Sequence, residues 1–123
     1  MFLQLAHTKL DVFQSSKAFV LCAYAFVKAF PAEERYSLTS QIRRAALSVH
    51  LNIAEGSSRK SDPERRRFYE IARGSLIEVD TALDIAAALH YGDADALKEL
   101  GETIIKTFKI LSGLIKRCEP THN

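Results

Sequence analysis

The sequence predicts an all-α fold in which one domain, residues 1–123, forms an antiparallel up-down-up-down four-helix bundle. The composition favours one globular core, because 47% of the 123 residues are hydrophobic and 26% are charged. Three prolines and five glycines are too few for the many turns of an all-β chain. Four segments with helical periodicity are separated by short connections, and such connections place neighbouring helices antiparallel.

The first helix is expected at residues 10–30 and the second at residues 37–56. The first ends against Pro31, and Thr8 and Asp11 have the spacing of an N-terminal cap. Gly56 is expected to end the second helix in a left-handed cap. Residues that repeat every three or four positions predict the inward faces, which are Val12, Ser16, Phe19, Ala23, Phe26 and Phe30, then Leu38, Ile42, Ala45, Val49 and Ile53.

The third helix is expected at residues 61–90 and the fourth at residues 93–117. Ser61 followed by Pro63 and Glu64 is typical of a capped helix start. Gly92 is expected to end the third helix and Asp93 to cap the fourth. The predicted inward faces are Phe68, Ile71, Ser75, Ala82, Ile85 and Leu89 in the third helix, and Leu97, Leu100, Ile104, Phe108, Leu111 and Ile115 in the fourth.

The overall charge and the cysteines exclude several classes of protein. Seventeen basic against fifteen acidic residues give a net charge of +2, too weak a bias to indicate nucleic acid or membrane by itself. Cys22 and Cys118 lie far apart, which argues against a disulfide framework or a thiolate zinc site and favours a cytoplasmic protein. The longest apolar run, residues 18–27, falls short of the roughly 20 residues of a membrane span.

The apolar faces of two helices are wider than one core requires. Apolar residues between positions 19 and 27 surround the first helix, and a second apolar stripe runs beside the first along the third helix. At about 25 cal/mol per Å² of apolar surface, leaving these faces in water would cost several kcal/mol. We therefore expect a homo-oligomer, with the tightly covered core of a monomer as the alternative. The candidate interface residues are Phe19, Tyr24, Phe26, Tyr69, Leu76 and Leu83.

Basic residues concentrate in the middle of the chain. Residues 35–73 contain nine basic and four acidic residues, a net charge of +5, and the remaining eight basic and eleven acidic residues give −3. This segment could bind phosphates, with Phe68 or Tyr69 available for stacking. A solvated, partly ion-paired face is the alternative. The candidate nucleic-acid-binding residues are Arg43, Arg44, Arg59, Lys60, Arg65, Arg66, Arg67 and Arg73.

A structural motif is predicted where the second and third helices face each other. Asn52 and Glu55 share a helix face near the loop and could form a polar site. A structural role is favoured, in which Glu55 pairs with an arginine of the loop or the third helix and Asn52 bonds the backbone of the following connection. Gly56 is the expected cap, and Gly74 is expected to allow close helix approach, because glycine within a helix costs about 1 kcal/mol relative to alanine.

Four sequence segments carry a family resemblance. They are FPAEERYSLT at residues 30–39, QIRRA at 41–45, NIAEG at 52–56 with Arg59, and ARGSL at 72–76. Across roughly residues 10–114 the chain resembles the four-helix-bundle proteins encoded in intervening sequences of bacterial 23S ribosomal RNA genes, a superfamily that includes accessory proteins of diversity-generating retroelements. The resemblance implies an up-down bundle, a closed ring that is pentameric in relatives, and a link to nucleic acid.

No catalytic pattern emerges from the sequence. The helices lack the Glu-x-x-His pairs of a di-iron bundle, and the glycines are scattered singly rather than grouped in a phosphate-binding loop. His50 is interpreted as a packed or surface histidine. We therefore expect no enzyme activity, cofactor, metal or small-molecule substrate. Two hypotheses remain: an oligomeric scaffold that binds RNA, DNA or a ribonucleoprotein, and a protein interaction module that binds no nucleic acid.

Overall fold

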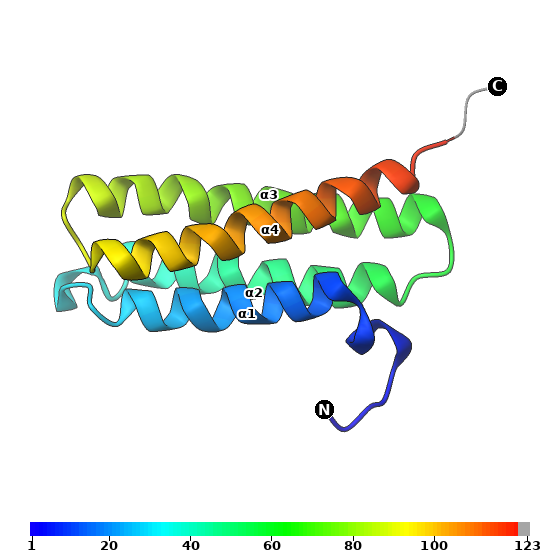
Figure 1. Cartoon of the computed structure of the whole chain (residues 1–123), viewed down its shortest axis with the longest axis horizontal. Helices are drawn as coiled ribbons and strands as arrows, with labels where there is room; N and C mark the ends of the chain where they lie inside the picture. The colour runs from blue at the N-terminus through cyan, green and yellow to red at the C-terminus, as the bar shows by residue number, and fades with distance from the viewer. Residues whose placement is uncertain (121–123) are drawn as a thin grey trace.

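The structure is a computed structural model that describes residues 1–120, and within that range it is all-α. The four main helices are α1 (Asp11–Val27), α2 (Leu38–Ser57), α3 (Asp62–Ala88) and α4 (Ala94–Arg117). Two short 3₁₀ helices, η1 (Ala6–Lys9) and η2 (Ala32–Glu34), precede α1 and α2. Figure 1 shows the four helices side by side along the long axis of the molecule, with each helix antiparallel to the one before it in the chain, which confirms the predicted antiparallel bundle.

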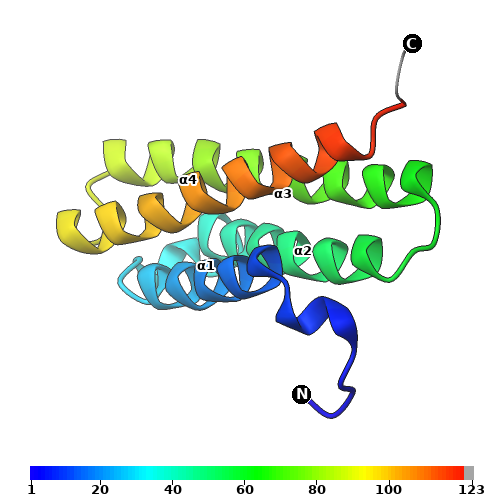
Figure 2. The ribbon, with the colours of Figure 1, turned by 45° about the vertical axis from the view of Figure 1, so that its right-hand side comes forward.

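Each helix packs against two neighbours. Contacts join α1 to α2, α2 to α3, α3 to α4, and α4 back to α1, and the α2–α3 pair is the most extensive. The turned view in Figure 2 shows the same order, with α1 and α2 forming one layer and α3 and α4 the other. The α1–α2 and α3–α4 connections therefore lie at one end of the bundle, and the α2–α3 connection lies at the other end.

The core runs the length of the bundle and takes side chains from every helix. The large, fully buried side chains include Phe19 of α1, Ile42 and Ile53 of α2, Leu76 of α3, and Leu111 of α4. All six inward residues predicted for the first helix are buried, and so are four of the five predicted for the second. Helical periodicity therefore predicted these two faces correctly.

The inward face of α3 differs from the prediction. Ile71, Ile85 and Leu89 were expected inside, yet they are 43%, 52% and 48% exposed. The neighbouring stripe is buried instead, and its members are Tyr69, Ala72, Leu76, Val79, Leu83 and Ala86. Periodicity could not choose between two adjacent apolar stripes, because both satisfy a helical repeat and only packing against α2 and α4 separates them.

One position of α4 also differs. Phe108 was expected in the core but is 39% exposed, whereas the neighbouring Thr107 is fully buried. The hydroxyl of Thr107 lies 2.7 Å from that of Ser15 in α1, so the two polar groups satisfy each other inside the bundle. This hydrogen bond crosses the α1–α4 contact and ties the first helix to the last.

The helix ends are partly as predicted. The Ser61 hydroxyl accepts the Glu64 backbone N–H at 3.3 Å, and the Asp93 carboxylate accepts a backbone N–H at 3.3 Å, so both predicted caps are confirmed. Thr8 is no cap, because it lies in η1 and its hydroxyl donates to the carbonyl of Leu5. No side chain caps α1, and the helix ends at Val27, before the end at residue 30 that Pro31 predicted.

The α3–α4 turn contains both positive-φ residues of the described chain. Helix α3 ends at Ala88, and His90 adopts a left-handed φ of 60° while its N–H bonds Ala87. Gly92 follows with a φ of 81°, and an added Cβ there would lie 2.6 Å from Cζ of Phe26. Glycine is therefore required both by the backbone conformation and by the contact with α1.

Candidate nucleic-acid interface

The structure divides the predicted basic segment among three places. Arg43 and Arg44 lie in the first half of α2, near the α1–α2 connection, whereas Arg59 and Lys60 lie in the α2–α3 connection. The helix between Arg44 and Arg59 spans about 22 Å at 1.5 Å per residue. Arg65, Arg66 and Arg67 follow in the first turns of α3, and Arg73 faces α4. The segment that carries a net charge of +5 in sequence is therefore not one patch in space.

The first place is an open groove of about 610 Å³ between the end of α1, η2 and the start of α2, which we call the arginine groove. It contains three arginines, two tyrosines, two small hydroxyl residues and an apolar floor. No carboxylate lines it within the described residues. The lining residues are Tyr24, Val27, Phe30, Pro31, Ala32, Arg35, Tyr36, Thr39, Ser40, Arg43, Arg44 and Leu47.

Neutral neighbours hold the arginines of this groove. The Arg43 guanidinium carbon lies 4.7 Å from the centre of the Tyr24 ring, a cation–π contact between α2 and α1. Arg44 donates from Nη2 to the Gln41 side-chain carbonyl at 2.9 Å. Over residues 1–120, neither arginine forms an ion pair. Their charges are therefore oriented but not neutralised.

The start of α2 adds to the positive character of the groove. Ser37 occupies the cap position but its side chain makes no capping hydrogen bond, and the first turn has no acidic residue. The first backbone N–H groups of a helix carry partial positive charge. Thr39 and Ser40 of that first turn line the groove. The acidic residues Glu33 and Glu34 are on η2, where Glu34 accepts a hydrogen bond from the Tyr91 hydroxyl at 3.1 Å.

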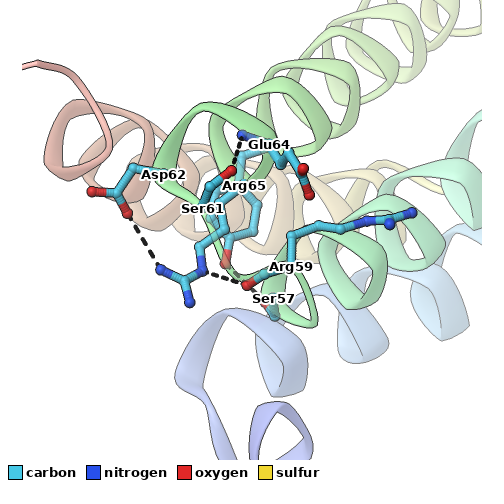
Figure 3. Close-up of polar contacts among 7 residues, drawn as sticks. Ser57, Arg59, Ser61, Asp62, Glu64 and Arg65 are labelled. Atoms are coloured by element: carbon cyan, nitrogen blue, oxygen red, sulfur yellow. Dashed lines mark hydrogen bonds and ion pairs between the residues drawn. The ribbon is translucent and has the colours of Figure 1, made fainter.

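The second place is the α2–α3 connection, where the arginines have carboxylate or backbone partners (Figure 3). Arg65 donates from Nε to the carbonyl of Arg59 at 2.8 Å and pairs with Asp62 at 3.3 Å. Ser57 bonds the buried Tyr69 through their hydroxyls at 2.9 Å. These contacts fix the turn between the two helices, so Arg65 acts as a structural residue.

The neighbouring arginines are also paired. Arg66 lies 2.8 Å from Glu70 and 3.9 Å from Glu119, and Arg59 lies 3.5 Å from Glu55. We call Arg59, Arg65 and Arg66 the paired arginine cluster. Arg67 and Lys60, in contrast, form no ion pair within residues 1–120. The guanidinium carbons of Arg59 and Arg67 lie 4.9 and 6.0 Å from the centre of the Phe68 ring, so Phe68 is not free for stacking on a base.

The third place is occupied by Arg73 alone. Its Nη1 donates to the Ser112 hydroxyl at 3.3 Å, a contact that joins α3 to α4. The side chain is half-buried. Arg73 is therefore placed to support helix packing and lies apart from both other groups.

The four residues of the predicted structural motif have different roles. Glu55 pairs with Arg59, one of the expected partners. Among the described residues, no ion pair joins α2 to α3, so Glu55 does not pair with an arginine of the third helix. The contact between those helices includes the Ser48 and Ser75 hydroxyls at 3.0 Å. Asn52 bonds the preceding turn, donating to the Ser48 carbonyl at 2.9 Å, rather than the following connection.

Both glycine predictions are wrong. Gly56 does not end α2, which continues to Ser57; it is buried, and an added Cβ would lie 3.0 Å from Cβ of Phe68. Gly56 is therefore the residue that allows α2 and α3 to approach closely. Gly74, which was expected to do so, is exposed with nothing within 4 Å of an added Cβ. The reason is the rotation of α3, which turns Gly74 outward together with Ile71.

The candidate oligomer interface needs a correction as well. Five of its six residues lie in the core of this chain and are at most 5% exposed: Phe19, Phe26, Tyr69, Leu76 and Leu83. They are covered by the chain's own helices and are inaccessible to a second copy. Tyr24 is half-buried in the arginine groove.

Buried polar groups occupy the α1–α2 contact near the N terminus. The Ser16 hydroxyl, fully buried, lies 2.6 Å from Nδ1 of His50, and the His50 ring packs on Phe13 at 4.4 Å between centres. Burial lowers the pKa of His50, and the charges of Lys17 and His7 lower it further. His50 is thus a half-buried, hydrogen-bonded histidine, which agrees with the first of the two interpretations, a packed rather than a surface histidine.

Tyr36 was not among the candidate residues, although it stands at the edge of the groove and is 89% exposed. Arg35 was counted with the basic segment but was not proposed as a binding residue. The signal in the sequence was the position of this pair directly after the Pro31 break, where a loop can expose both side chains.

No group of three or more potential metal ligands occurs in the described part of the chain, and none of its helices is long and apolar enough to cross a membrane.

The fold and these surfaces define a small all-α bundle with an unpaired arginine groove at one end and a paired arginine cluster at the other. A family model described as 23S rRNA-intervening sequence protein matches residues 8–113, and the chain belongs to that family. A Bacteroides thetaiotaomicron protein of unknown function, from the S23 ribosomal protein family, has a similar crystal structure with a TM-score of 0.76. It is 20% identical, and the alignment covers 85% of this chain and 98% of that one.

No curated protein matches the chain. The neighbour in Bacteroides supports the fold alone, because the sequence identity is 20%. The relation to accessory proteins of diversity-generating retroelements stays a prediction.

Proposed function

We propose that this protein is a non-enzymatic, homo-oligomeric helical bundle of the cytoplasm that binds nucleic acid through the arginine groove. The observation that carries the proposal is the set of three arginines, Arg35, Arg43 and Arg44, that line one groove with no carboxylate among the described lining residues. Phosphate groups recruit such unpaired guanidinium groups and the start of a helix. The groove is therefore a better candidate than the paired arginine cluster.

Homo-oligomer formation would need an exposed apolar surface, and two such surfaces flank α3. On one side, a groove of about 260 Å³ between α3 and α4 includes Ile77, Ile105 and Phe108, which are 50%, 57% and 39% exposed. On the other side, Leu51 of α2 and Ile71 of α3 are 56% and 43% exposed. Leu51 lies one turn after Ser48 in α2, and Ile71 lies one turn before Ser75 in α3. Because the two helices are antiparallel and the Ser48 and Ser75 hydroxyls are in contact, Leu51 and Ile71 lie beside each other.

Two different surfaces on one chain favour a heterologous contact, and such contacts close into a ring when the rotation between successive copies closes. A ring of five, which the family resemblance implies, would present the arginine groove five times. Repetition turns weak contacts with one strand into a higher overall affinity. A net charge of only +2 per chain is therefore compatible with nucleic-acid binding, because the grooves of several copies would act together.

The nucleophilic side chains favour a non-enzymatic role. Ser16, the serine beside His50, is fully buried and has no access to a substrate. Burial raises the pKa of the Cys22 thiol, and nearby Glu99 raises it further. Burial and Asp62 likewise raise the pKa of Cys118. The thiolate forms that nucleophilic catalysis requires are therefore disfavoured.

The proposal is tested by measuring the affinity for single-stranded and duplex oligonucleotides of 20 or so nucleotides across a salt series. The variant Arg43→Ala/Arg44→Ala should weaken binding at least about tenfold and reduce the slope of log affinity against log salt by about 1.4 to 1.8. The matched control Lys60→Ala/Arg67→Ala removes the same charge at the other end of the bundle. It should change the affinity less than about threefold.

Equal losses in the two double variants would contradict a specific role of the groove, and binding independent of salt would contradict phosphate recognition. Light scattering on the same samples gives the oligomeric state, and Phe108→Asp should lower the mass by placing a charge in the apolar groove. An intact oligomer that binds no oligonucleotide would favour the second candidate function, a protein interaction module.

A further inference from the structure

Tyr36 is a large aromatic residue that the fold leaves almost entirely in water. Its side chain is 89% exposed at the edge of the arginine groove, whereas Tyr69 is buried and Tyr24 and Tyr91 are half-buried. An exposed tyrosine contributes little to the stability of the bundle. Its position beside three arginines therefore points to a contact with something outside the chain.

The backbone around Tyr36 is well fixed. Arg35 donates its N–H to Ala32 at 3.1 Å, and the N–H of Ser37 donates to Glu34 at 3.0 Å, so hydrogen-bonded turns flank Tyr36 on both sides. Helix α2 begins at Leu38 directly afterwards. A ring held on an ordered turn loses little conformational freedom when a ligand covers it.

The two tyrosines of the groove have different surroundings. The Arg43 guanidinium covers the ring of Tyr24 at 4.7 Å, so this tyrosine positions the arginine. The Arg35 guanidinium carbon lies 6.0 Å from the centre of the Tyr36 ring, a looser contact that leaves the ring accessible. Of the two rings, that of Tyr36 is therefore the one left free to stack on a ligand.

Stacking on an aromatic side chain requires a base that is not already stacked and paired. Proteins that bind single strands combine a basic groove along the backbone with aromatic side chains for the bases. The groove volume of about 610 Å³ falls within the roughly 300 to 1,000 Å³ of pockets that enclose small molecules. A concavity of this size accommodates a nucleotide of a flexible strand, whereas the bases of a duplex stay inside the helix.

We propose that the arginine groove is specific for single-stranded nucleic acid, with one unpaired base on the Tyr36 ring and its phosphates on Arg43 and Arg44. This inference rests on the proposed function and names its ligand. The phosphate contacts supply affinity that depends on salt. The stacking contact supplies the preference for a single strand, and it accepts any base because every base has a π-face.

The test compares three ligands of equal length by fluorescence anisotropy: an unstructured single strand, its duplex, and a strand in which the bases are replaced by abasic sites. RNA and DNA single strands are both measured, since both offer the same base and phosphate chemistry. The wild type should bind the single strand at least about fivefold more tightly than the duplex. It should bind the abasic strand as weakly as the duplex.

The Tyr36→Ala variant should lose about tenfold in affinity for the single strand and keep its affinity for the duplex and the abasic strand. Its salt slope should be unchanged, because no phosphate contact is lost. Tyr36→Phe should bind as the wild type does, since the ring is retained. Because Tyr36 is 89% exposed, the unfolding midpoint of both variants should equal that of the wild type.

Equal affinity for single strand and duplex, or equal weakening of both by Tyr36→Ala, would overturn the inference and leave the proposed function standing. Failure of all three ligands to bind would overturn both. A loss caused by Tyr36→Ala with an unchanged duplex affinity supports the inference even where Arg43→Ala/Arg44→Ala weakens every ligand.

Discussion

The arginine groove and the paired arginine cluster each contain three arginines, but at opposite ends of the bundle and with different neighbours. In the cluster, carboxylates stand three or four residues away along the chain: Glu55 for Arg59, Asp62 for Arg65 and Glu70 for Arg66. In the groove, the neighbours of Arg43 and Arg44 are Tyr24 and Gln41. The number of positive charges is the same, and the local partners decide which charges can attract an anion.

The comparison extends to packing. At the α2–α3 end, Gly56 lets the helices close on Phe68 and Tyr69, and hydrogen bonds fix the connecting turn. At the α1–α2 end, the longer connection and η2 leave an open groove. One end of the bundle is thus built for stability and the other end offers a concave, charged surface, which is why we place the proposed binding site there.

The largest expected effect tests the packed end. Gly56→Val should destabilise the protein by about 2 kcal/mol, because its Cβ alone would approach Cβ of Phe68 and the Tyr69 ring to 3.0 Å. Gly113→Val is the matched control, since an added Cβ at Gly113 meets nothing within 4 Å; we expect a change within about 0.5 kcal/mol. Urea unfolding of both variants measures the difference. Similar destabilisation by both would refute the packing role of Gly56.

The second expected effect tests the role of the carboxylate partners. One variant adds a carboxylate to the arginine groove, and the other removes a carboxylate from the paired arginine cluster. Gln41→Glu replaces the amide that now accepts from Arg44 with a carboxylate, so nucleic-acid affinity should fall by about threefold to tenfold. Glu70→Gln removes the partner of Arg66, and affinity should stay equal or rise slightly. Anisotropy titrations at low salt compare the variants. An unchanged affinity of Gln41→Glu would mean that Arg44 does not contact the ligand.

The smallest expected effect concerns His50, a half-buried titrating residue that belongs to neither region. The pKa of His50 is lowered in the folded protein below the ordinary value of about 6.5, so the unfolded chain binds a proton that the folded chain does not. Stability is therefore fully present above pH 6.5 and decreases as the pH falls through and below that value. Thermal unfolding at pH 7.5 and 6.0 should show a lower midpoint at pH 6.0.

The variant His50→Gln should lose this part of the pH dependence, because it has no titrating side chain there. Guanidinium groups stay charged over the same range. Binding by the folded protein should consequently change little between the two pH values. The same decrease of the midpoint in His50→Gln as in the wild type would assign the effect to another group.

Much of the fold could be predicted from the sequence because its signals are local. The periodicity of residues 12–30 and 38–53 and the Ser61 and Asp93 caps depend on neighbours within one or two turns. Pro31 was a weaker signal, because α1 ends at Val27 rather than against the proline. The pairing within the cluster could have been read in the same way, since helical ion pairs stand three or four residues apart. The sequence also shows that no carboxylate stands three or four residues from Arg43 or Arg44.

What the sequence by itself determined was therefore the all-α class, the approximate helix bounds and the separation of polar from apolar faces. Tertiary structure alone decided the rotation of α3, which buried Leu76 and exposed Ile71, because both stripes satisfy the helical repeat and differ only in the surfaces that α2 and α4 present. It also decided which glycine permits close approach, Gly56 rather than Gly74, since a glycine matters only where another helix lies against it. The arginine groove likewise exists only once η2 has brought Arg35 and Tyr36 beside α2.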